Sequence, residues 1–244
     1  MMLVELVDGQ WREPQPFFAG DRDSRSFEPA FQPETELLYF VSDRPLPGEA
    51  ERGDFNIWRI PKTDQGWGEA EALSSAVNGE GHEFYPSLTT SGDLYFTAAR
   101  EDGVGGEDLW VARAAGTGFH AAQLLDGGVN LAADEFNAAV NAEGTVLVFG
   151  SVRDDGPGGG DLYFSRRAAG EPWPAASLLA GVNTPGLDFC PFFDPQGTHL
   201  WFTSTRRDLE QEPGSWSEQR QRWVQSGNGF GDLFRIPLPL QEAE

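Results

Sequence analysis

The sequence has one cysteine, few basic residues and no long apolar run, and each shortage excludes a class of protein. Cys190 alone cannot form an internal disulfide. There are 17 Lys and Arg residues against 39 Asp and Glu, which gives a net charge of −22. Nucleic acids and anionic membranes bind patches of Lys and Arg, so we expect neither as a partner. No run approaches the roughly 18 apolar residues of a membrane helix, so we expect no membrane insertion.

Four segments of the chain resemble one another. Each contains a phenylalanine near its start and an arginine at its end, and the phenylalanines are 57, 52 and 53 residues apart. The segments are SFEPAFQPETELLYFVSDR (26–44), EFYPSLTTSGDLYFTAAR (83–100), EFNAAVNAEGTVLVFGSVR (135–153) and DFCPFFDPQGTHLWFTSTR (188–206). Repeats of this length indicate a fold built from identical supersecondary units.

Each repeat predicts four short antiparallel strands. A first strand, a turn such as SGD or PQG, and an apolar run such as LYFTA are followed by a glycine-rich loop and a third strand such as DLYFSRR. A fourth strand carries an aromatic residue near its start and leads to Asn78, Asn130 or Asn183. Four-stranded repeats are typical of a β-propeller. The predicted fold is therefore one all-β propeller domain with repeats at about 26–78, 83–130, 135–183 and 188–240.

The two ends of the sequence predict how the propeller closes. The last repeat stops after its third strand, and residues 10–18 have the pattern of a fourth strand, so we expect this N-terminal strand to complete the last blade of a closed four-bladed ring. MMLVEL, however, looks like a surplus third strand, which leaves five blades as an alternative. We expect a monomer; pairing with another chain through an exposed edge is the alternative.

The pattern N-x5-F-x-P, turn, LYF-x-S-x-R, Gly-rich loop, D-L-Y resembles the TolB-like and WD-repeat-like propellers of bacterial cell envelopes. The residues NGEGHEFYPSLTTSGDLYFTAAREDGVGGEDLW carry the likeness, which spans nearly the whole chain. The resemblance implies a bacterial protein-interaction or ligand platform in the envelope or periplasm. The start MMLVELVDGQW has no signal-peptide pattern, which instead favours the cytoplasm, so the compartment stays open.

Strand direction predicts which residues share one mouth of the propeller channel. The inner strands begin at Glu83, Glu135 and Asp188, and we expect these acids to form a binding site there. Nearby on the same face we expect structural ion pairs between arginines that end the second strands and aspartates near the starts of the third: Arg44, Arg100, Arg153, Arg206, Asp54, Asp108, Asp161 and Asp232.

The long loop 207–231 of the last repeat is predicted to lie on this face as a lid or partner-binding element. Its candidate contact residues are Trp216, Arg220 and Trp223. We expect no catalytic residues and no cofactor; a calcium ion held by the mouth carboxylates is the alternative.

The predicted function is a non-catalytic binding or scaffold propeller whose acidic face engages a protein, peptide or carbohydrate. A small glycosidase-like hydrolase that uses the mouth carboxylates is the alternative enzyme. The equivalent positions of the three acids argue against it, because an acid and a base need different environments.

Overall fold

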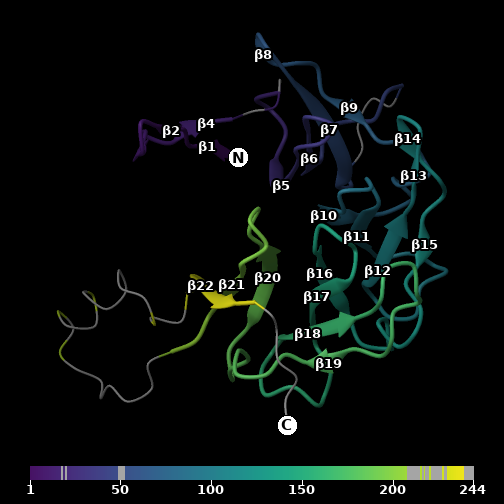
Figure 1. Ribbon diagram of the computed structural model, residues 1–244, viewed down its shortest axis with the longest axis vertical. Coiled ribbons are helices and arrows are strands. Elements are labelled where there is room, and N and C mark those ends of the chain that lie inside the picture. Colours follow the sequence, from purple (N-terminus) through teal and green to yellow (C-terminus); the bar gives the residue numbers. More distant parts are fainter. Residues whose placement is uncertain are drawn as a thin grey trace. The chain divides into compact units, whose positions relative to one another are not determined.

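The computed structural model describes residues 1–17, 19, 21–48, 53–207, 215, 217, 220, 227 and 230–238. The elements that it describes in full are β-strands (Figure 1), and none of the described residues belongs to a helix long and apolar enough to cross a membrane. The chain forms two compact units, Met1–Arg100 with Trp110–Gln123, and Glu101–Leu109 with Leu124–Glu244.

Four antiparallel sheets follow the repeats and confirm the predicted all-β propeller fold, with one blade for each repeat. The first contains β5 Ser26–Gln32, β6 Leu37–Ser42, β7 Asn56–Thr63, β8 Gly66–Trp67 and β9 Glu71–Ala72. The second contains β10 Glu83–Leu88, β11 Leu94–Ala98, β12 Asp108–Ala112 and β15 Gln123–Leu124, with a side hairpin of β13 Ala114–Ala115 and β14 Gly118–Phe119. The third contains β16 Glu135–Val140, β17 Val146–Ser151, β18 Asp161–Arg166 and β19 Ser177–Leu178, and the fourth contains β20 Asp188–Phe193, β21 His199–Ser204 and β22 Asp232–Pro237.

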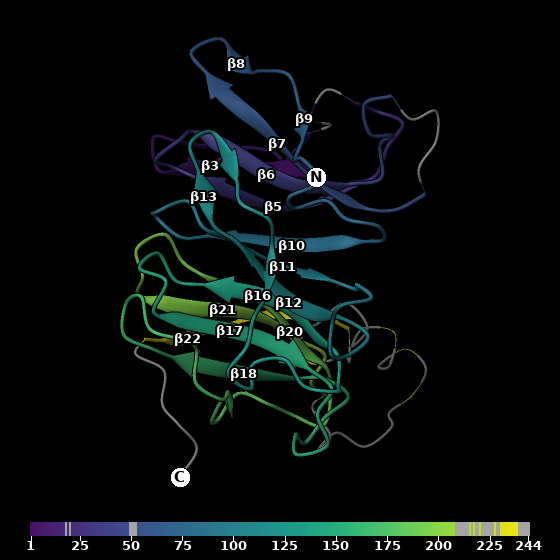
Figure 2. The ribbon, with the colours of Figure 1, turned by 90° about the vertical axis from the view of Figure 1, so that its right-hand side faces the viewer.

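The middle strands of the second and third blades are apolar runs, as expected of strands that are buried on both faces. Every residue of β11, LYFTA, is buried, and so are all but the first of β17, VLVFGS. In the second unit the third and fourth sheets pack on each other, and Figure 2 shows β16 and β17 running beside β20 and β21. The core between them contains Val148, Leu162, Phe164, Leu179, Leu200 and Phe202.

Each inner strand has a bulge that the sequence did not reveal. The residue after the repeat phenylalanine lies in the left-handed region, with φ of 51°, 53°, 54° and 50° at Glu28, Tyr85, Asn137 and Cys190. The pairing register with the second strand shifts at each of these sites. Left-handed non-glycine residues are strained, so the surrounding strands must hold them in place. One stabilising contact is the Tyr85 backbone N–H, which donates to the Glu28 carboxylate at 2.7 Å.

Of the residues expected to close the last blade, 10–18, two pairs form strands within the N-terminal segment instead. There β3 Gln10–Trp11 pairs with β2 Leu6–Val7, and β4 Gln15–Pro16 pairs with β1 Met2–Leu3. The backbone groups of β3 and β4 are thus paired with β2 and β1, in the N-terminal stretch that resembles a surplus third strand. Within the described residues β22 pairs only with β21.

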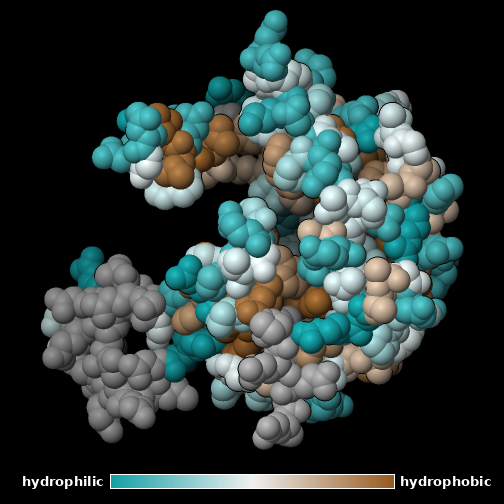
Figure 3. All heavy atoms as spheres, viewed as in Figure 1, coloured by the Kyte–Doolittle hydropathy of each residue, from teal (hydrophilic) through white to brown (hydrophobic). Residues whose placement is uncertain are grey.

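The N-terminal strands leave apolar side chains exposed, and Figure 3 shows these side chains in brown at the upper left. Met2 is 61% exposed and Leu6 is 56% exposed. With Phe31 and Trp67 of the first blade, residues 1–4 line a groove of about 360 Å³.

Candidate functional site

The three acids predicted to line the channel mouth are buried and held by arginines. Glu83, Glu135 and Asp188 each begin an inner strand, and each is fully buried. Their carboxylates form ion pairs with the arginine that follows the second strand of the same blade: Arg100 at 3.2 Å, Arg153 at 3.1 Å and Arg206 at 3.3 Å. In these three blades the arginines therefore pair with the acids that begin the inner strands, whereas the sequence predicted pairs with the aspartates near the starts of the third strands.

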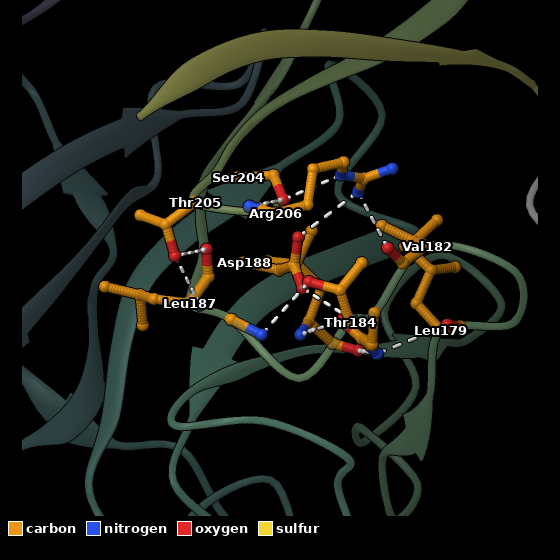
Figure 4. Close-up of polar contacts among 11 residues, drawn as sticks. Leu179, Val182, Thr184, Leu187, Asp188, Ser204, Thr205 and Arg206 are labelled. Atoms are coloured by element: carbon orange, nitrogen blue, oxygen red, sulfur yellow. Dashed lines mark hydrogen bonds and ion pairs between the residues drawn. The ribbon is translucent and has the colours of Figure 1, made fainter. Parts of the chain in front are cut away.

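The last blade shows the full set of bonds around one acid (Figure 4). The Asp188 Oδ1 accepts from Arg206 Nη2, and its Oδ2 accepts from the backbone N–H and the hydroxyl of Thr184 at 2.7 and 2.8 Å. Arg206 also donates to Ser204 Oγ at 2.8 Å and to the Val182 carbonyl at 2.9 Å. Asp188 thus links the inner strand β20 to the loop before it, which contains Val182 and Thr184.

Each arginine is also held by aromatic rings of the second and third strands. The guanidinium carbon of Arg100 lies 4.6 Å from the Trp110 ring centroid, and that of Arg153 lies 4.7 Å from the Tyr163 ring centroid. Arg206 lies 4.2 Å from the Phe234 ring centroid. Such cation–π contacts add to the ion pairs.

The first blade keeps the arginine without the acid. Ser26 occupies the position of the acids, and Arg44 donates to the hydroxyls of Ser26 and Ser42 and to the Ala19 carbonyl at 3.2 Å. Burial lowers the pKa of Arg44, and the nearby charges of Asp21 and Asp43 partly offset this effect. In this blade the arginine is therefore held by hydroxyl and carbonyl oxygens, without a carboxylate from the inner strand.

The third-strand aspartates fold the glycine-rich loops. Asp108 accepts from the Val104 backbone N–H at 2.8 Å, Asp161 accepts from that of Gly158 at 2.9 Å, and Asp232 accepts from that of Gly227 at 2.7 Å. The first blade has Asn56 at this strand position, and Asp54 lies two residues earlier. Glycine is needed in these loops because a Cβ at Gly158 would overlap the backbone of Thr184 and Gly186.

Burial raises the pKa of one inner-strand acid and of one third-strand aspartate. The pKa of Glu135 is raised by burial, although the Leu131 N–H, Ser151 and Arg153 lower it in part. The pKa of Asp161 is raised by burial and by the charges of Asp188 and Asp155, against the Gly158 hydrogen bond. Asp161 Oδ1 is buried without a hydrogen-bond partner in the described part of the chain, so its ionised form is poorly compensated.

Asp161→Asn is therefore expected to raise the melting temperature near pH 7. Because the folded-state pKa is raised, the ionised carboxyl costs stability above that pKa, and this cost disappears as the pH falls below the ordinary aspartate value of about 3.9. Asparagine keeps the oxygen that accepts from Gly158 and already occupies this position in the first blade as Asn56. Thermal melts across this pH range measure the effect.

Asp194→Asn is the matched control with the opposite sign. Thr198 and His199 donate to Asp194 and hold its pKa at about 2, so its ionised form stabilises the fold above the unfolded-state pKa. The variant should melt lower near pH 7, and its deficit should shrink in acid. A loss of stability near pH 7 in Asp161→Asn would contradict the account.

The predicted lid lies mostly outside the described residues. Trp216 and Trp223 belong to the part of the loop that the structure does not describe, and Arg220 is exposed. Among the described residues, no three His, Cys, Asp or Glu side chains form a group that could hold a metal ion.

Four rings gather at the start of the first two inner strands, and the sequence did not predict that they form a group. Phe27, Phe55, His82 and Phe84 form what we call the aromatic cluster, with centroid distances from 5.1 Å for Phe27–Phe55 to 6.4 Å for Phe27–Phe84. His82 is exposed and the three phenylalanines are half-buried. Only Phe27 and Phe84 carry the repeat signal; Phe55 and His82 precede strands at positions where the other repeats have different residues.

The aromatic cluster is held by local contacts and already bears one cation. His82 Nδ1 accepts from the Phe55 backbone N–H at 3.0 Å. The Arg25 guanidinium lies 4.6 Å from the Phe55 ring centroid and pairs with Asp43 at 2.7 Å. The aromatic rings of the cluster therefore lie next to the ion pair of Arg25 and Asp43.

Comparison with known proteins finds likeness in structure alone. No protein-family model matches the sequence, and no curated protein matches it. A putative TolB from Agrobacterium tumefaciens matches with a TM-score of 0.52 at 13% identity, over 76% of this chain and 56% of that one.

Two further structures show the same likeness. A calcium-binding regucalcin from Agrobacterium tumefaciens matches with a TM-score of 0.50 at 17% identity, over 90% of this chain and 63% of that one. A chain of a nidogen/laminin complex matches with a TM-score of 0.54 at 14% identity, over 83% of this chain and 65% of that one. This chain thus spans less than two thirds of each. At these identities the comparisons show that it shares the β-propeller fold of TolB-like and other propellers.

Proposed function

We propose that this protein is a non-catalytic binding propeller that engages a basic segment of a protein or peptide through the aromatic cluster. The observation that carries the proposal is that this cluster, with His82 exposed and its three phenylalanines half-buried, belongs to a chain with a net charge of −22. Exposed rings bind cations through their π-faces, and a strong net charge attracts partners of the opposite sign.

The inner-strand acids support a non-catalytic role. Glu135 Oε1 accepts from Ser151 and Arg153, and its Oε2 accepts from the Leu131 N–H at 2.8 Å. A general acid or nucleophile must reach its substrate, and a fully buried carboxylate with both oxygens bonded is poorly placed to do so. The same burial argues against a calcium ion at these carboxylates.

The cation over Phe55 is an internal example of the contact proposed for the partner. Arg25 is held there by Asp43, and an incoming Arg or Lys could use the remaining ring faces of Phe84 and His82. A neutral carbohydrate could stack on the same rings, but it would gain nothing from the charge of −22. The charge therefore favours the basic peptide.

Titration with fluorescein-labelled octa-arginine tests the proposal. Binding should weaken with salt, and Phe55→Leu should weaken it about 3- to 10-fold, because leucine keeps apolar packing but removes the π-face. The matched control is Phe31→Leu, which alters an exposed ring at the other end of β5 and should leave binding unchanged. Equal losses in the two variants, or equal binding of octa-glutamate, would contradict the proposal.

A further inference from the structure

The sheet of the first blade has an apolar face that ends in a lysine. In the strand register Phe31 is opposite Leu38, and Leu38 is opposite Ile60. Two residues further along β7, Lys62 is opposite Trp67 of β8. Residues opposite one another, and residues two apart along a strand, point to the same face of a sheet. The five side chains therefore share one face.

The N-terminal segment covers this face only in part. The ring centroid of Phe17 lies 5.2 Å from that of Trp67, and both rings pack on the apolar core of the first blade. Phe31 stands nearly perpendicular to Trp67 at a centroid distance of 6.3 Å, and it remains 45% exposed. These three rings line the groove of about 360 Å³, a volume within the range of about 300–1,000 Å³ that is usual for small-molecule sites.

Lys62 brings a positive charge to this groove. It is the only lysine in a sequence that has 39 acids, and of the described residues that line the groove it alone has a charged side chain. No acid in the described part of the chain forms an ion pair with it. Glu36, whose carbonyl accepts from the Lys62 N–H at 2.8 Å, and Asp64 in the following turn do not line the groove. The Lys62 ammonium is therefore available to an anion bound there.

The net charge of −22 limits the kind of anion that this groove accepts. At physiological ionic strength the Debye length is about 8 Å, so the distant acids of the chain act only weakly on a single carboxylate in the groove. A polyanion would extend over the surrounding acidic surface and be repelled. An apolar peptide or a second copy of the chain would make no use of the ammonium. The groove therefore favours a small molecule with an apolar body and one negative charge.

We propose that this groove binds a small amphiphile whose carboxylate pairs with Lys62 and whose apolar body lies against Phe31 and Trp67. Burial of the apolar body provides the affinity, and the one charged contact fixes the orientation. The groove is at the opposite end of β5 from Phe27 of the aromatic cluster, so this proposal and the peptide proposal can each fail without the other.

The probe is decanoate, titrated into the whole chain and followed by isothermal titration calorimetry. We expect one saturable site with a dissociation constant of about 0.1–1 mM, in keeping with a ligand of about a dozen non-hydrogen atoms.

Two variants of Lys62 test the charged contact. Lys62→Met keeps the apolar stem and removes the charge, and it should bind decanoate about 3- to 5-fold more weakly, the usual effect of an exposed ion pair. Lys62→Arg keeps the charge and should bind within about 2-fold of the parent. Lys62 is exposed, so both variants should keep the melting temperature of the parent.

A second pair of variants tests the place of binding. Phe31→Ser removes an exposed ring from the groove and should weaken decanoate binding at least about 5-fold, because the ligand loses apolar surface to cover. The matched control is Phe192→Ser, which removes a ring that is 53% exposed on β20 in the other compact unit and should leave binding unchanged.

Three results would overturn the proposal. The first is no saturable binding at about 2 mM decanoate, and the second is equal affinity of Lys62→Met and Lys62→Arg, which would show that the charge is not used. The third is self-association of the chain, seen by sedimentation, reversed by decanoate and lost in Phe31→Ser, which would assign the groove to a second copy.

Discussion

Glu135→Ala is expected to lower the free energy of unfolding by about 3–5 kcal/mol, the usual cost of removing one partner of a buried ion pair. The side chain is fully buried, and its removal leaves the Arg153 guanidinium, the Leu131 N–H and the Ser151 hydroxyl without their shared acceptor. The cation–π contacts of Arg153 with Phe149 and Tyr163 remain but replace no hydrogen bond. Urea denaturation followed by tryptophan fluorescence measures the loss.

Glu135→Ser is the matched control for this variant. It recreates the arrangement of the first blade, where Ser26 and Ser42 accept from Arg44 in place of a carboxylate. We expect it to be less destabilising than Glu135→Ala, because a hydroxyl can still accept from Arg153. A Glu135→Ala protein within about 0.5 kcal/mol of the parent would show that the acid is not structural, and would reopen its role as a ligand or catalyst.

Asn78→Ala is expected to cost about 2–4 kcal/mol, because each buried backbone group that loses its partner costs about 1–3 kcal/mol. Asn78 accepts from the Ile57 N–H at 2.9 Å and donates to the carbonyls of Ile57 and Leu73 at 3.0 and 2.9 Å. Ile57 and Val77 are fully buried and Asn78 is 4% exposed, so water has little access to replace the lost bonds. The melting temperature and the urea midpoint report the change.

Asn183→Ala provides an internal comparison. Asn183 makes the same three bonds, but it is half-buried and its contact with the Leu179 carbonyl is longer, at 3.3 Å. Water can therefore replace part of its role, and we expect a smaller loss than for Asn78→Ala. A reversed order of the two variants would contradict the role assigned to burial.

The repeat made the fold predictable from the sequence. Because Phe27, Phe84, Phe136 and Phe189 recur with their arginines and turns, the four blades and the strand order within them could be assigned before the structure was known. The pairing partners of the N-terminal strands were harder to predict from the sequence. Residues 10–18 match a fourth strand in sequence, but only the structure shows that Gln10–Trp11 pairs with β2 and Gln15–Pro16 pairs with β1.

The site could be predicted only in part. Strand direction placed Glu135 and Arg153 near each other, but sequence could not show that the carboxylate is fully buried and accepts from three groups. The left-handed residues gave no sign either, because Tyr85 and Cys190 stand where glycine or asparagine would be expected. The aromatic cluster escaped notice because Phe55 and His82 break the repeat.

The most direct test of the central claim is a crystal structure of the chain with calcium chloride and octa-arginine. The account predicts that the carboxylates of Glu135 and Asp188 stay bonded to Arg153 and Arg206 with no cation between them, and that peptide density lies over Phe55 and Phe84. A calcium ion coordinated by either carboxylate, or peptide bound away from the aromatic cluster, would contradict it.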